Sequence, residues 1–120
     1  MQDFRKLAAW QLAHKLTLAT YKVTKDFPER ELYGLTSQVR RSAVSIAANI
    51  AEGCCRSGDA EFARFLHVAL GSASELEYHL LLARDLGFLS PAGYRQLNDN
   101  AVRVKQMLTR LIRKLKNNDK

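Results

Sequence analysis

The sequence predicts an all-α protein, folded as an antiparallel up-down-up-down four-helix bundle. Apolar residues return every three or four positions through four long stretches, which is the spacing of one face of an α-helix. No stretch alternates apolar and polar residues over a useful length, as a half-buried strand would. Only two prolines and six glycines occur, and most stand where the helical periodicity resets. Short turns between amphipathic helices favour the up-down arrangement.

The first two helices are expected at about residues 6–26 and 29–55. Pro28 stands as proline does at a helix start, where its missing N–H costs nothing. Asp26 and Glu29 have the spacing of a capping box at the same place. The second helix also carries a run of small residues on several faces. Since small residues let another backbone approach closely, we expect this helix to be surrounded on more than one side.

The last two helices are expected at about residues 59–86 and from Ser90 onward. Gly87 stands where a left-handed C-cap belongs. Ser90 and Pro91 have the types preferred at the N-cap and first position of a helix. Some apolar residues lie off the main apolar stripe of their helix and favour self-association, the alternative being that the stripes are simply broad. They are Trp10, Phe65, Val68, Met107 and Ile112.

Length and composition indicate one folded domain that spans residues 1–120. A chain of this length is typical of a single domain. The chain is 47% apolar and 26% charged, which excludes disorder as its main state. Its longest uncharged runs, residues 42–51 and 65–74, are too short to cross a membrane. The two cysteines, Cys54 and Cys55, are adjacent and form no disulfide framework. We therefore expect a cytoplasmic protein without a membrane partner.

Metal and catalytic motifs are missing, so we expect no enzyme, no metal and no cofactor. Helical bundles hold di-iron centres with Glu-x-x-His pairs, and no glutamate here is followed by histidine at that spacing. The three histidines, His14, His67 and His79, are predicted on different surfaces. No phosphate-binding loop is present, because Gly53 and Gly58 are followed by Asp59 and Ala60 and not by the Lys and Ser or Thr that such a loop needs. A metal-dependent enzyme is the weakest hypothesis that we retain.

Asn49 and Glu52 are polar residues within an apolar stretch of the second helix and are candidates for a structural polar pair. A buried asparagine can fix the register or oligomeric state of packed helices. A glutamate near a helix C-terminus is unfavourable to the helix dipole, which suggests a basic partner from another helix or subunit, such as Arg40, Arg41 or Arg56. The alternative is that Glu52 is simply solvated.

Positive charge is concentrated near the C-terminus. The whole chain has a formal net charge of +7, with 19 Lys and Arg against 12 Asp and Glu. Basic side chains away from an apolar stripe are suited to phosphate contacts, although a solvated helix face gives the same pattern. The candidate nucleic-acid-binding residues are Arg40, Arg41, Arg110, Arg113, Lys114 and Lys116.

Residues over about 4–111 also follow the pattern of a known family, and its most specific part is the block from Asn49 to Gly53. The sequence resembles the four-helix bundle proteins encoded by intervening sequences in bacterial 23S ribosomal RNA genes. Further matching residues are Trp10, Phe27-Pro28, Leu32-Tyr33-Gly34-Leu35, Arg40-Arg41 and Leu86-Gly87.

The resemblance implies a small cytosolic bundle that assembles as a homopentamer. It also implies kinship with the accessory variability protein of diversity-generating retroelements, a basic pentamer that binds nucleic acid and a reverse transcriptase. It supplies no catalytic residues. The sequence thus predicts a non-enzymatic homo-oligomer, pentameric by this resemblance, that binds structured RNA or DNA through its basic residues. The alternative is a protein-interaction scaffold or accessory subunit without direct nucleic-acid binding.

Overall fold

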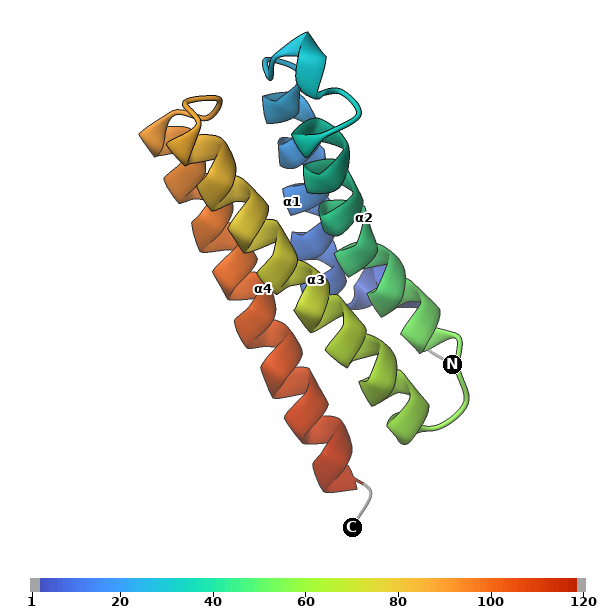
Figure 1. The fold of residues 1–120 in the computed structure, drawn as a ribbon. Helices are drawn as coiled ribbons and strands as arrows, with labels where there is room; N and C mark the ends of the chain where they lie inside the picture. The colour runs from blue at the N-terminus through green and yellow to red at the C-terminus, as the bar shows by residue number, and fades with distance from the viewer. Residues whose placement is uncertain (1–2, 119–120) are drawn as a thin grey trace.

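The structure is a computed structural model that describes residues 3–118, so the outermost ends of the predicted domain, residues 1–2 and 119–120, lie outside the described residues. Within the described part there is no strand. Each helix runs opposite to the one before it (Figure 1), which confirms the predicted all-α bundle. The elements are η1 (Phe4–Lys6), α1 (Ala8–Thr24), η2 (Glu29–Glu31), α2 (Leu35–Cys54), α3 (Asp59–Asp85) and α4 (Pro91–Asn118).

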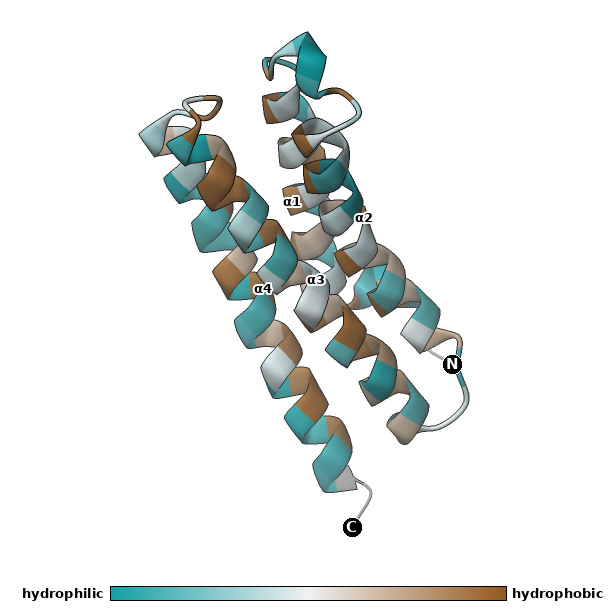
Figure 2. Cartoon of the chain, in the orientation of Figure 1, coloured by the Kyte–Doolittle hydropathy of each residue, from teal (hydrophilic) through white to brown (hydrophobic). Residues whose placement is uncertain are grey.

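The four helices close around one core. α2 packs between α1 and α3, and α4 packs between α3 and α1, so each helix has two neighbours. Every helix carries both hydrophobic and hydrophilic residues along its length (Figure 2), as expected of a helix with one apolar stripe facing the core. Each helix supplies completely buried side chains to the core. Examples are Leu16, Ile46, Leu76 and Leu108, each stabilising the fold by about 1.5–3 kcal/mol relative to an exposed position.

The turn between α3 and α4 confirms both predicted caps. Gly87 has a φ angle of 80°, in the left-handed region that glycine adopts without strain. The backbone N–H of Phe88 then donates to the carbonyl of Ala83 over 2.9 Å, as in a Schellman C-cap. At the start of α4, Oγ of Ser90 accepts the backbone N–H of Gly93 over 3.0 Å. The two helices are therefore joined by a turn whose conformation local sequence dictates.

The second helix begins later than predicted, at Leu35 rather than near residue 29. Gly34 interrupts the helix, because its φ of −113° and ψ of −114° are not helical. The carboxylate of Glu31 then accepts the backbone N–H of Leu35 over 3.1 Å. A short η2 turn and a capping carboxylate thus replace the first turns of the expected helix.

The predicted capping box of Asp26 and Glu29 is wrong. η2 starts after Pro28, and no side chain caps it. The reason is that the chain forms only a single 3-10 turn here, so the arrangement that brings both side chains onto the backbone of a continuing α-helix never develops.

Most of the apolar residues predicted to lie off the main stripes are buried within one chain. Phe65 is 8% exposed and Ile112 is 5% exposed. Trp10 and Met107 are half-buried against the core, and the Trp10 indole stacks on the His14 ring. Only Val68, at 45% exposure, is exposed. The stripes are therefore broader than the sequence suggested, and these residues, apart from Val68, give no support to self-association.

Candidate nucleic-acid interface

The last third of α4 presents four cations, Arg110, Arg113, Lys114 and Lys116, which we call the α4 basic segment. All four are exposed. None forms an ion pair with another residue among 3–118. Cations near a helix C-terminus also interact favourably with the helix dipole, which stabilises them without neutralising their charge. The segment therefore presents uncompensated positive charge to solvent.

The α4 basic segment divides between two sides of the helix. Arg110 and Lys114 border a groove shared with Ala8 of α1. Arg113 and Lys116 border a second groove shared with α3, on the opposite side of α4. The four cations thus lie on two sides of α4 and do not form one row along the helix.

A second helix extends this charge, which sequence reasoning missed. Ala8 and Arg110 line one groove, and α1 and α4 run in opposite directions. Seven residues make about two helical turns and return to the same side. Lys15, seven residues after Ala8, therefore lies level with Arg103, seven residues before Arg110, and both are exposed. We call Lys15, Arg103, Arg110 and Lys114 the α1–α4 basic face. Only the packing of α1 against α4 reveals that Lys15 belongs to it.

One carboxylate lies near this face. Asp99 shares a shallow hollow of about 560 Å³ with Arg103 and Arg110 on the outer side of α4. It forms no ion pair with either arginine. The α1–α4 basic face therefore keeps a positive balance.

Arg40 and Arg41 do not join the α4 basic segment. They follow the start of α2, whereas the segment ends α4 at the opposite end of the bundle (Figure 1). Arg41 borders a groove between α2 and α3, whereas Arg110 borders a groove between α1 and α4, so the two side chains lie on different sides of the bundle. The predicted set is thus two separate clusters.

Arg40 and Arg41 also have different surroundings. Nε of Arg40 donates to Oγ1 of Thr24 over 2.8 Å. The guanidinium of Arg40 lies 4.8 Å from the centroid of the Tyr21 ring, a cation–π contact. Arg41 is exposed and borders a groove that also contains Glu75. Arg40 therefore serves packing between α1 and α2, and a carboxylate shares the surroundings of Arg41.

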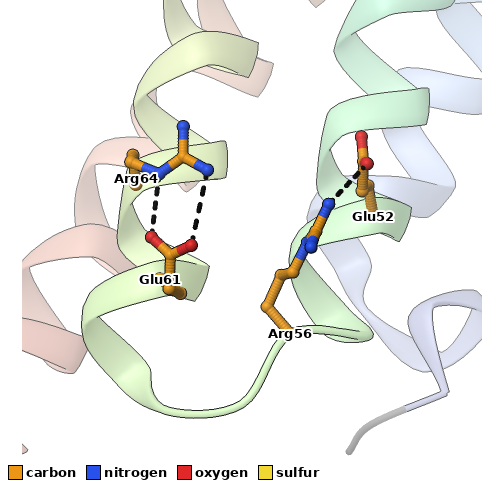
Figure 3. Close-up of polar contacts among 4 residues, drawn as sticks. All are labelled: Glu52, Arg56, Glu61 and Arg64. Carbon is orange, nitrogen blue, oxygen red and sulfur yellow. Dashed lines mark hydrogen bonds and ion pairs between the residues drawn. The ribbon is translucent and has the colours of Figure 1, made fainter.

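Asn49 and Glu52 do not bond to each other. The Asn49 amide donates to the carbonyl of Ser45 over 2.8 Å and to its Oγ over 3.0 Å. Glu52 accepts from Arg56 over 2.9 Å (Figure 3). The partner of Glu52 is thus one of the three predicted arginines, but it comes from the same chain, four residues further on.

A second ion pair faces the first across the α2–α3 turn (Figure 3). Nε of Arg64 lies 2.8 Å from Oε2 of Glu61, and this hydrogen bond lowers the pKa of the Glu61 carboxyl below its ordinary value. The guanidinium groups of Arg56 and Arg64 lie 4.8 and 4.5 Å from the centroid of the Phe65 ring. These two arginines are therefore neutralised and add little to the positive field.

The described residues contain no group of three His, Cys, Asp or Glu side chains placed to hold a metal ion. Cys54 is buried, and its burial raises the pKa of the thiol, whereas Cys55 is exposed. Over the same part of the chain, none of the helices is both long and apolar enough to cross a membrane.

The fold and its charged surface define the class of this protein, a four-helix bundle with a basic surface. Residues 5–110 match the family described as 23S rRNA-intervening sequence protein, and the chain belongs to that family. A crystal structure of a protein of unknown function from the S23 ribosomal protein family of Bacteroides thetaiotaomicron VPI-5482 is similar to it. That similarity has a TM-score of 0.79 and 25% sequence identity, and covers 88% of this chain and 98% of the other. Among curated proteins, none matches this chain.

Proposed function

We propose that this protein is a non-enzymatic, cytoplasmic, homo-oligomeric bundle that binds structured RNA or DNA through the α4 basic segment. The observation that carries the proposal is that Arg110, Arg113, Lys114 and Lys116 are exposed and have no carboxylate partner among the described residues. Lys15 and Arg103 extend the same surface. Arg40 and Arg41 are left out, since the first is engaged by neighbouring side chains and the second has a carboxylate nearby.

The size of the surface suits a nucleic-acid backbone. From Arg103 to Lys116, α4 spans roughly 20 Å, the length of about six phosphates of one strand at about 3.4 Å each. Neutralising phosphates releases condensed counterions, so such contacts supply affinity without base readout. The description of the family, which links it to 23S rRNA genes, supports RNA as the first nucleic acid to test.

Self-association, with a pentamer as the proposed state, is supported by exposed apolar side chains between α1 and α2. Thr17 of α1 donates to the carbonyl of Ala43 of α2 over 3.2 Å. The next residues, Leu18 and Val44, are 58% and 42% exposed, and Tyr21 is 41% exposed. Apolar side chains gathered on one surface are typical of contacts between subunits. An oligomer also repeats the α4 basic segment, so that the local potential sums over copies.

Replacement of the four cations by glutamine tests the binding proposal. We expect the variant Arg110→Gln, Arg113→Gln, Lys114→Gln, Lys116→Gln to lose most affinity for a labelled RNA hairpin, measured by fluorescence anisotropy. The control removes the same charge away from the α4 basic segment, through glutamine at the exposed residues Lys25, Arg30, Arg41 and Arg95. Equal losses in both variants would mean that net charge, and not the α4 basic segment, determines binding.

A protein-interaction scaffold is the second candidate, and one observation favours it. Tyr33 is 94% exposed and its neighbour Leu32 is 44% exposed, in the connection between η2 and α2. Exposed tyrosines are frequent anchors of protein interfaces. Recovery of one stoichiometric protein partner after nuclease treatment, lost in a Tyr33→Ala variant, would favour this function over nucleic-acid binding.

A further inference from the structure

A polar groove runs between α2 and α3, away from the α4 basic segment. Its volume is about 460 Å³, within the range of roughly 300–1,000 Å³ found for small-molecule sites. Arg41 and Ser42 border it from α2, and Glu75 and His79 border it from α3. No aromatic side chain other than the His79 imidazole lines the groove. A nucleobase, which is usually held by stacking, is therefore a poor occupant.

His79 is a buried side chain with an unused ring nitrogen. It is 7% exposed, and its Nδ1 lies 3.3 Å from Oγ of Ser42. That Oγ also lies 3.0 Å from the carbonyl oxygens of Gln38 and Val39. A serine hydroxyl has one proton, so in the tautomer in which that proton goes to a carbonyl, Nδ1 is the donor to Ser42. In that tautomer Nε2 is a hydrogen-bond acceptor, and it has no partner among residues 3–118.

Two side chains of opposite charge border the same groove. Arg41 and Glu75 are both exposed, and neither forms an ion pair with another described residue. An anion held by Arg41 would be repelled by Glu75, and a cation held by Glu75 would be repelled by Arg41. A molecule that carries both charges can place each of them beside the side chain of opposite sign, so that attraction outweighs repulsion.

We propose that this groove binds a small zwitterion of the amino-acid type. Its carboxylate accepts hydrogen bonds from the Arg41 guanidinium. Its ammonium donates to the carboxylate of Glu75 and to Nε2 of His79. The groove is open to solvent, so the affinity expected is weak, with a dissociation constant in roughly the millimolar range. The proposal is independent of nucleic-acid binding.

Matched probes test the charge requirement. Glycine, β-alanine and 4-aminobutyrate differ in the distance between their charges, while butyrate and butylammonium each carry one charge. Each is titrated at constant ionic strength into the full ¹⁵N-labelled chain, and the amide and imidazole signals are recorded by NMR. We expect saturable shifts at Ser42 and His79 with at least one zwitterion and none with either singly charged probe. Binding of butyrate as strong as that of the zwitterions would overturn the proposal.

Variants locate the site. Arg41→Gln and Glu75→Gln should each weaken binding of the best zwitterion at least about tenfold, because each removes a charge-assisted hydrogen bond. Arg95→Gln, on an exposed position of α4, should leave it unchanged. Absence of saturable shifts with every zwitterion in the folded wild-type chain would contradict the proposal. So would a drop in particle mass by light scattering in the Arg41 and Glu75 variants, because the groove would then be occupied by a second copy.

Discussion

Nζ of Lys105 lies 2.7 Å from Oε1 of Glu77, and this ion pair joins α4 to α3. Both side chains are partly shielded, with 33% and 23% of their surfaces exposed. Lys105 therefore differs from Arg110 only five residues further along the same helix, which is exposed and forms no ion pair with a described residue. Lys105 is therefore engaged in the packing of α4 on α3, whereas Arg110 is the cation that we propose contacts phosphates.

Replacing Arg110 and Lys105 by glutamine should have different effects on RNA binding. Arg110→Gln should flatten the log–log dependence of RNA affinity on salt by about 0.7–0.9, the contribution of one phosphate contact. Lys105→Gln removes the same formal charge but should leave that slope unchanged, and should lower the free energy of unfolding by at most about 1 kcal/mol. Equal changes in slope for the two variants, measured by fluorescence anisotropy, would show that Lys105 also contacts phosphates.

Gly53 should be required by close packing between α2 and α3. A Cβ at position 53 would lie 2.9 Å from Cδ1 of Phe62 and 3.0 Å from Cβ of Phe65. We expect Gly53→Ala to lower the free energy of unfolding by about 1–3 kcal/mol, as overpacked core substitutions do. Gly71→Ala is the control, since nothing lies within 4 Å of its added Cβ, and it should raise stability by about 0.5–1 kcal/mol. Urea unfolding measures the free energy of unfolding of both variants. A Gly53→Ala variant more stable than the wild type would contradict the observed packing.

The carboxyl of Glu61 should titrate below its ordinary pKa of 4.5, because Arg64 donates to it. Since the folded pKa is lowered, the ion pair is intact above the unfolded value and is lost as the pH falls through the folded value. Arg64→Gln should raise the pKa of Glu61 toward its ordinary value, while Arg95→Gln should not. Carboxyl chemical shifts measured by NMR against pH report both values. A pKa unchanged by Arg64→Gln would show that the pair is not formed in solution.

The proposed pentamer should give a particle mass about five times the chain mass of 13.6 kDa. Leu18→Glu and Val44→Glu should each shift the mass toward a single chain, because a charge would replace an exposed apolar side chain at the proposed contact. Tyr78→Glu, on the outer side of α3, is the control. Light scattering after size-exclusion chromatography gives these masses. A wild-type mass equal to that of one chain would refute self-association.

The fold could be predicted because each helix and the turn before α4 are specified by residues close together in the sequence. The spacing of apolar residues identifies four helices, and Gly87 and Ser90 identify the turn before α4. The start of α2 was misplaced since Gly34 can continue a helix or interrupt it. Its non-helical conformation, and the Glu31 carboxylate that accepts the backbone N–H of Leu35, are not evident from the spacing of apolar residues. Phe65 and Ile112 belong to broad buried stripes, the alternative to self-association, and sequence could not decide between the two because the width of a buried stripe depends on how neighbouring helices cover it.

The candidate site was only partly predictable. The α4 basic segment is contiguous in the sequence, so composition revealed it. Lys15 is far from Arg103 along the chain, and only the α1–α4 packing brings the two to one level. Conversely, Arg40 reads as a free cation in the sequence, yet Tyr21 and Thr24 engage it. Whether a basic side chain is free to bind a ligand depends on its tertiary contacts, which the sequence alone does not show.

The most direct test of the proposed function is the salt dependence of binding between the wild-type chain and a labelled structured RNA. Fluorescence anisotropy would be measured at several salt concentrations from low to moderate. With about four to six cations contacting phosphates, we expect affinity to fall steeply with salt, with a log–log slope of about −3 to −5 per chain. No binding at low salt would contradict nucleic-acid binding. The charge of +7 would then serve another purpose, and a protein scaffold would become the better account.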